Sequence, residues 1–213
     1  MPGPTYLLTG TDAVAEGKLA GMTEHTHHHD EDSACAVAHS PVAPATSAAG
    51  VVPGAAAGGA GERTLVAVFA SPVAGYLLRY GADMGFRGLL LEPDEARAAG
   101  AAALGFPLLT AVPDDLDDSA DVIVTDHHRP ELGVMIRDAL ATKARWVGIM
   151  GNPHHVGPHV AMLTELGVPA EEIARVHRPI GLNIGSRIPP EIAVSTLAGL
   201  LADRNGRPGG FEF

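Results

Sequence analysis

From residue 64 onward, apolar runs of strand length alternate with amphipathic segments. The strand-like runs are residues 64–70, 87–93, 107–112, 120–127 and 145–152, and the helical segments are residues 71–86, 94–105, 130–144 and 155–167. Continuously apolar strands that alternate with helices are typical of a parallel sheet covered on both faces. The pattern therefore predicts an α/β fold, a Rossmann-like doubly wound parallel sheet.

The composition changes sharply near residue 63. Residues 41–63 are mostly Ala, Gly and Pro without helical or alternating periodicity, which predicts a linker. Before it lies a short irregular segment, residues 1–40, which is too small for a core of its own. After it we expect one Rossmann-like domain over residues 64–205 and a tail over 206–213.

The formal net charge of −11 excludes some classes of partner. Nucleic acids and anionic membranes both select a basic surface, so neither is expected here. The single cysteine, Cys35, rules out an internal disulfide within one chain, which fits a reducing compartment. The first ten residues have no signal-peptide pattern and no run approaches a membrane span. A cytoplasmic protein is the expectation.

Ligands of doubly wound sheets bind outside the carboxyl ends of the strands. Polar residues and glycines follow several predicted strands here: Ser71, Glu92, Asp126, His127, His128, Gly151 and Asn152. The first strand-to-helix turn reads "VFASPVAG", which lacks the glycines that let a pyrophosphate approach the backbone. Pro72 also removes an amide donor. Tight NAD(P) binding is therefore not expected, although an NAD(P)-dependent oxidoreductase stays among the alternatives.

Histidines gather at two predicted strand ends. His127 and His128 follow Asp126, and His154, His155 and His159 follow Asn152. Metal binding is one interpretation, and exposed loop histidines are the other. The segment 25–39 also contains five histidines, but without the spacing of a structural zinc site, so we expect at most adventitious metal affinity there.

A basic cluster surrounds the sequence "PIGLNIG" near the carboxyl terminus. Arg175, His177, Arg178 and Arg187 lie within thirteen residues of an otherwise acidic chain. Either this stretch binds an anionic ligand, which Gly181 and Gly185 would admit to the backbone, or it is the last buried strand and the arginines are surface charges. Two prolines then open a helix that is apolar nearly all round and is expected to be buried.

The sequence "WVGIMGN…LTELGVPAEEIARVHRPIGLNIGSRIPPEIAVSTLAGLLA" closely resembles the carboxyl-terminal Rossmann domain of the XdhC/CoxI family. These proteins are maturation factors for molybdenum hydroxylases such as xanthine dehydrogenase. The positions that keep the family pattern are Gly148, Gly151, His177, Pro179, Ile180, Gly181, Leu182, Ile184, Gly185, Pro189, Glu191, Ile192, Ala193 and Ser195. Asn183 and Ile188 depart from it, since the family carries aspartate and a helix-capping threonine there.

The resemblance implies binding of molybdenum cofactor (molybdopterin), an anionic phosphorylated pterin, and its delivery to a molybdenum hydroxylase apoenzyme. It implies a chaperone rather than an enzyme, with sulfur supplied by a cysteine desulfurase, and leaves a homodimer open. A scaffold that acts by protein contact alone and a histidine-based metal carrier stay as alternatives. The candidate cofactor-binding residues are Ser71, Glu92, Asp126, His127, Gly151, Asn152, His177, Arg178, Gly181, Asn183, Gly185 and Arg187.

Overall fold

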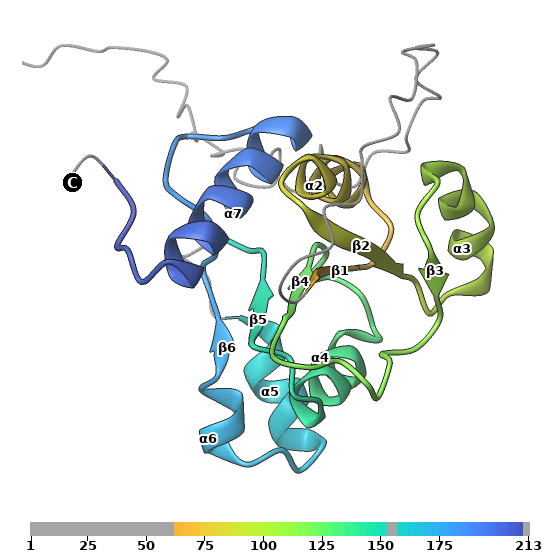
Figure 1. Ribbon diagram of the computed structural model, residues 1–213. Helices are drawn as coiled ribbons and strands as arrows, with labels where there is room; N and C mark the ends of the chain where they lie inside the picture. The colour runs from red at the N-terminus through yellow and green to blue at the C-terminus, as the bar shows by residue number, and fades with distance from the viewer. Residues whose placement is uncertain (1–61, 153–156, 211–213) are drawn as a thin grey trace, which may run out of the picture. The chain divides into compact units, whose positions relative to one another are not determined.

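Six parallel strands form one sheet in the order β3-β2-β1-β4-β5-β6 (Figure 1). The computed structural model describes residues 62–152 and 157–210. The strands are β1 (Arg63–Val68), β2 (Phe86–Leu91), β3 (Leu108–Leu109), β4 (Ala120–Val124), β5 (Trp146–Ile149) and β6 (Val176–His177). This strand order is the doubly wound topology, so the predicted fold class is confirmed.

Helices cover both faces of the sheet (Figure 1). They are α2 (Pro72–Asp83), α3 (Glu95–Ala101) with the 3-10 turn η1 (Ala102–Leu104), α4 (Leu132–Ala141), α5 (Pro158–Glu165), α6 (Ala170–Ile173) and α7 (Pro189–Arg204). Alternation along β1 separates two cores: Leu65 and Ala67 pack with α2 and α7, whereas Val66 and Val68 pack with α4 and α5. The continuous apolar strands are thus explained by burial on both faces.

The first helix begins as the sequence predicts. The Ser71 hydroxyl accepts a hydrogen bond from the Ala74 amide at 3.0 Å, and Pro72 occupies the first helical turn. Such a cap satisfies one of the amides that the helix start leaves without an intrahelical partner. The helix predicted over 155–167 starts only at Pro158, because that proline follows the extended N-cap residue Gly157.

For the carboxyl-terminal part, one of the two interpretations of "PIGLNIG" and the expectation for the following helix are wrong. Residues 179–185 are not a buried strand, since β6 ends at His177 and most of this stretch is an exposed loop. Helix α7 is not buried all round: Leu197 and Leu200 face the core, but Val194 is 49% exposed. Ile188 gives α7 no side-chain cap, as its apolar side chain predicts.

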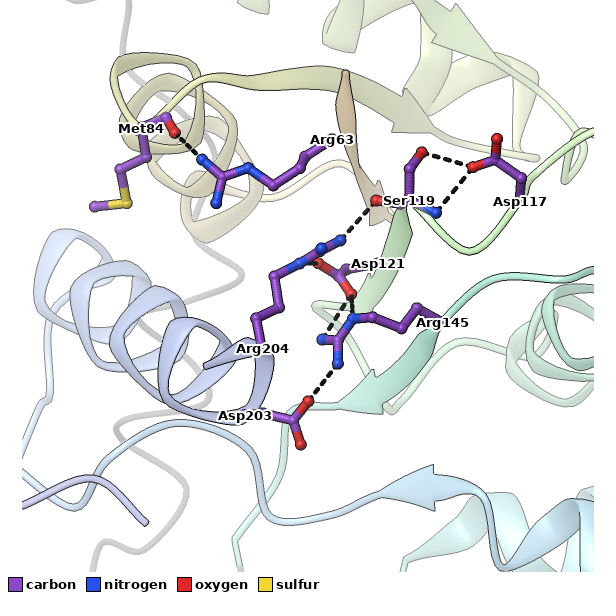
Figure 2. A network of polar contacts seen from close by, with 8 residues as sticks. All are labelled: Arg63, Met84, Asp117, Ser119, Asp121, Arg145, Asp203 and Arg204. Carbon is purple, nitrogen blue, oxygen red and sulfur yellow. Dashed lines mark hydrogen bonds and ion pairs between the residues drawn. The ribbon is translucent and has the colours of Figure 1, made fainter. Parts of the chain in front are cut away.

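An ion-pair network fixes the end of α7 to the amino-terminal edge of the sheet (Figure 2). The Asp121 carboxylate on β4 is fully buried and accepts hydrogen bonds from Arg145 Nε at 2.9 Å and Arg204 Nε at 2.5 Å. Burial raises the pKa of Asp121. The hydrogen bonds from the two guanidinium groups lower this pKa, but burial is the larger effect. Arg145 also donates to Asp203, which closes the network on α7.

The predicted amino-terminal segment 1–40, nearly all of the linker 41–63 and the histidines of segment 25–39 fall outside the described residues. Strand β1 begins at Arg63 and α7 ends at Arg204, next to the predicted domain limits of 64 and 205. No described helix has the length and apolar character needed to span a bilayer.

We predict that Asp121→Asn destabilises the domain by about 2–4 kcal/mol. Breaking a buried ion pair leaves the partner charge uncompensated, and here two arginines lose a carboxylate while keeping some contact with water. Urea unfolding followed by circular dichroism measures the loss. The control Asp138→Asn removes only the surface pair with Arg137 and should cost about 0.2–1 kcal/mol. Equal losses in the two variants would contradict the structural role of Asp121.

Candidate functional site

The carboxyl ends of β1 and β4 form the crossing point where a dinucleotide fold would bind its ligand. Here the turn directly after β1 carries a large buried side chain. Phe69 follows β1 with a φ of 72°, and its side chain is fully buried. A non-glycine residue at positive φ costs backbone strain, which the surrounding contacts must offset. The sequence pattern drew attention to Ser71 and Pro72 but missed Phe69, which gives no signal of positive φ.

Hydrogen bonds across the same point hold the two strand ends together. Thr125 donates its hydroxyl to the backbone carbonyl of Phe69 at 2.9 Å. Its oxygen lies 3.0 Å from the Ser71 hydroxyl, and all three residues are buried. Ser71 thus has a structural position in the turn as well as its capping role in α2. Thr125 was absent from the sequence-based candidates, because a threonine at a strand end is unremarkable by itself.

Glu92 is fully buried and carries several hydrogen bonds at once. Its oxygens accept from Arg129 Nη2 at 2.7 Å and Nη1 at 3.1 Å, which is a bidentate pair. They also accept from the amides of Ala70 at 2.9 Å and Asp94 at 3.1 Å. The Arg129 guanidinium lies over the Phe69 ring, 4.5 Å from its centroid. Glu92 therefore connects the turns after β1, β2 and β4.

This network uses both carboxylate oxygens of Glu92 and leaves the residue no exposed surface. An acid that binds a ribose must present a free oxygen at the crossing point. The geometry gives Glu92 a positioning role instead. Arg129 is the residue of this network that sequence reasoning missed, and the signal available was a lone arginine directly after the histidine pair of a strand end.

Beyond the Glu92 network lies the end of β4. The Asp126 carboxylate accepts a hydrogen bond from the His128 amide at 2.8 Å, which forms a tight turn. The rings of His127 and His128 lie 4.0 Å apart and tilted by 39°. Among residues 62–152 and 157–210, no three histidine, cysteine or acidic side chains converge as a metal ion requires. The predicted metal partners His154 and His155 lie outside the described residues.

The ends of β5 and β6 bring Gly151, Asn152 and Arg178 together. Arg178 donates from Nη2 to the Asn152 carbonyl at 2.9 Å. Its guanidinium covers Gly151 so closely that a Cβ built there would lie 2.7 Å from Nη2. Glycine at 151 is thus required by the arginine. All three residues are among the sequence-based candidates, Gly151 and Asn152 as residues after a strand and Arg178 as part of the basic cluster, and the structure brings them into contact.

His159 lies in the first turn of α5, beside this cluster. Its side chain is 6% exposed, and the ring atoms Nδ1 and Cε1 would both lie 2.5 Å from a Cβ at Gly157. Burial lowers the pKa of His159, and the positive charge of Arg178 lowers it further. The imidazole is therefore held in its neutral form near pH 7.

His177 is separated from its neighbour Arg178. Its ring stacks on Trp146 with centroids 5.0 Å apart, and Trp146 belongs to the core that contains α7. Burial lowers the pKa of His177, with the charge of Asp203 acting in the opposite direction. Successive strand residues point to opposite faces, which explains the separation. The prediction that places His177 in one site with Arg178 is not supported by this geometry.

The loop after Arg178 packs on α7 through its glycines. A Cβ at Gly181 would lie 2.8 Å from Ser195 Oγ, and a Cβ at Gly199 would lie 2.8 Å from the Gly181 Cα. Ser195 donates to the Leu182 carbonyl at 2.5 Å. The close approach at Gly181 therefore serves helix packing rather than access for a ligand. Gly185, with a φ of 70°, has open space around it instead.

The other end of the loop is exposed. Asn183 and Arg187 both face solvent, and Ile184 and Ile188 are 55% and 48% exposed. The Arg187 amide donates to the Glu191 carboxylate at 3.1 Å, which connects the end of the loop to the first turn of α7. Arg178 and Arg187 thus lie at the two ends of one loop. Arg178 contacts Gly151 and Asn152, whereas Arg187 faces solvent.

Comparison with known proteins agrees with this architecture. A crystal structure described as a xanthine dehydrogenase of Bacillus halodurans has a similar fold, with a TM-score of 0.53 and 19% sequence identity, over 68% of this chain and 45% of that one. YqeB of Escherichia coli K12, an uncharacterized protein, is 36% identical over 94 residues. That match spans 44% of this chain and 17% of YqeB.

The family model of the XdhC Rossmann domain matches residues 65–200, which contain every strand from β2 to β6 and nearly all of β1. The match also contains the Glu92 network and the Arg178 cluster. The chain therefore belongs to the XdhC Rossmann-domain family.

Proposed function

We propose that this protein takes part in the maturation of a molybdenum hydroxylase related to xanthine dehydrogenase, and that it does so by binding molybdenum cofactor. Membership of the XdhC family supports the first part. The second part rests on one observation above all: the Arg178 guanidinium is fixed against Gly151 at the carboxyl edge of the sheet. This edge is where doubly wound folds bind their ligands.

The position of the ligand follows from which part of the edge is filled. Phe69, Ser71 and the Glu92–Arg129 pair occupy the crossing point between β1 and β4. We therefore place the ligand further along the edge, over the ends of β4, β5 and β6. The proposed contacting residues there are Asp126, His127, Gly151, Asn152 and Arg178, with Gly185, Asn183 and Arg187 reached by a larger ligand.

The charge at this part of the edge fits a phosphorylated pterin. Arg178 lies beside a backbone carbonyl and glycines. The formal net charge of the whole chain is −11, so this guanidinium brings positive charge to one place on an otherwise acidic protein. A guanidinium can bind two phosphate oxygens in parallel, which a lysine cannot reproduce. Because no metal-binding cluster exists among the described side chains, we assign only the phosphate end of the cofactor to them.

The partners of this function are also proposals. A maturation factor must transfer its ligand, so we propose a molybdenum hydroxylase apoenzyme as the recipient and a cysteine desulfurase as the source of sulfur. The protein is then a carrier rather than an enzyme, and it works in the cytoplasm, where the apoenzyme is made.

A second function, contact with a partner protein without cofactor binding, is favoured by one specific observation. Ile184 and Ile188 in the loop and Val194 on α7 are each about half exposed. All three belong to one stretch of the chain, residues 184–194, and exposed apolar side chains are a feature of interaction surfaces. Changing the two isoleucines to serine would weaken binding to the apoenzyme under this alternative, while leaving cofactor affinity unchanged.

We predict that Arg178→Gln combined with Arg187→Gln weakens binding of purified molybdenum cofactor by about 10- to 100-fold, which corresponds to roughly 1.5–3 kcal/mol of lost charged hydrogen bonds. Equilibrium titration of the full chain measures the affinity. Arg79→Gln combined with Arg137→Gln is the matched control, because it removes two arginines from helices α2 and α4 and leaves the edge intact. Unchanged affinity in the folded Arg178 and Arg187 variant would place the ligand elsewhere.

We also predict that NADH and NADPH do not bind with micromolar or tighter affinity. The phosphates would need the space that Phe69 fills, and the ribose would need an oxygen that Glu92 gives to Arg129. Isothermal titration calorimetry with each nucleotide tests this. A Kd of about 1 μM or below would revive the oxidoreductase alternative.

A further inference from the structure

Helix α5 begins directly at the proposed ligand edge. Its N-cap residue, Gly157, has no side chain that could accept a hydrogen bond from the first turn, and Pro158 contributes no amide. The His159 amide is the first amide of the helix, and it lies at the helix start, where the helix dipole favours negative charge. The next amide, that of Val160, already donates to the Gly157 carbonyl at 3.4 Å. A helix start alone does not make a site, so the argument depends on the side chains around it.

The second observation is an orphaned polar atom. His159 is 6% exposed, and its Nδ1 has no hydrogen-bond partner among residues 62–152 and 157–210. Leaving a buried polar group without a partner costs about 1–3 kcal/mol. A histidine that only filled the core would carry this cost without a compensating contact. The unpaired buried nitrogen therefore points to a group that binds it.

The third observation is the position of that nitrogen relative to Arg178. A Cβ at Gly157 would lie 2.5 Å from Nδ1 of His159 and 3.1 Å from Cδ of Arg178. Both side chains thus border the space beside the Gly157 Cα, at the start of α5. A neutral imidazole, a guanidinium and the His159 amide at the helix start can all donate hydrogen bonds, which is the donor set that an oxyanion requires.

We propose that His159, Arg178 and the first turn of α5 form a binding site for a tetrahedral oxyanion, specifically the phosphate group of a phosphate monoester. The inference rests on the proposed function in one respect, since the phosphorylated pterin would be the natural source of that group. Free inorganic anions share the chemistry, and they serve as probes that do not depend on the cofactor.

The first experiment titrates the full chain with sodium sulfate by isothermal titration calorimetry. Sodium chloride in the buffer is lowered as sulfate is added, so that the ionic strength stays constant. Wild-type protein should bind one sulfate with a Kd of about 1 mM or tighter. Arg178→Lys should weaken binding by about tenfold, since the lysine ammonium loses the two-pronged contact. His159→Gln should weaken it by about three- to tenfold through loss of one donor.

Arg137→Gln is the matched control, because it removes an arginine from the exposed surface of α4. It should bind sulfate as wild type does. Circular dichroism confirms that each variant is folded, and Arg178→Lys keeps the test valid if His159→Gln proves unstable. Wild-type protein that fails to bind sulfate or inorganic phosphate, or binding that both site variants leave unchanged, would overturn the proposal.

The second experiment follows sulfate affinity with pH, which a purely structural histidine would not affect. The ordinary pKa of His159 is lowered in the folded protein by burial and by Arg178. A bound dianion opposes both effects, so sulfate binding should take up a proton. Affinity should rise by about threefold or more from about pH 7.5 to about pH 5.5 in wild type, and this rise should be smaller in His159→Gln.

Other ionisable groups at this edge could contribute to the same rise. Those on the neighbouring elements are Arg178 after β6 and Asp126, His127, His128 and Glu131 after β4. Among described residues, Arg178 is the charged group that acts on His159. A rise that persists in full in His159→Gln would assign the proton to one of the other groups and count against the proposal.

Sulfate and cofactor titrations together separate this inference from the proposed function. Sulfate binding that depends on His159 and Arg178, combined with no cofactor binding, keeps the oxyanion site and rejects the cofactor. Cofactor binding without any sulfate site keeps the function and rejects the site. If both bind, sulfate should compete with the cofactor in wild type, and a lack of competition would also reject the assignment of the phosphate to α5.

Discussion

The Glu92 carboxylate organises the whole carboxyl edge of the sheet. It accepts hydrogen bonds from the turn after β1, from the turn after β2 and, through Arg129, from the segment after β4. A buried carboxylate is stable only when its charge is paired and its lone pairs are occupied, and Glu92 meets both conditions. Moving any of the three turns would leave a buried charge or amide without its partner. The edge is therefore held in one arrangement.

That arrangement decides which part of the edge is open to a ligand. Arg129 is drawn over Phe69, and Phe69 fills the crossing point that a dinucleotide would need. The same fold then offers the ends of β5 and β6, where Arg178 rests on Gly151 beside the start of α5. The ligand that we propose for this region is recognised mainly through its negative charge, because Arg178 is the charged side chain fixed there.

At the opposite edge, Asp121 has the matching role for helix α7. Its two arginines connect β4, β5 and the last turn of the helix (Figure 2). The other end of α7 is fixed by the close contact between Gly181 and Gly199 and by the hydrogen bond from Ser195. The loop that follows Arg178 is thereby anchored at its start, while Ile184 and Arg187 stay exposed. Anchoring of this kind lets an exposed loop keep a defined shape.

The sequence by itself determined the parallel sheet, the start of α2 at Ser71 and Pro72, and the position of Gly151 and Asn152 after a strand. Apolar periodicity, capping chemistry and strand polarity are local or topological properties, so they can be read along the chain. Only the tertiary structure decided that Glu92 pairs with Arg129, that His177 stacks on Trp146, and that Gly181 meets α7 rather than a ligand. These outcomes depend on contacts between residues far apart in sequence, and the residue types alone leave several partners open. The orphaned nitrogen of His159 is of the same kind, because burial and the lack of a partner exist only once the chain has folded.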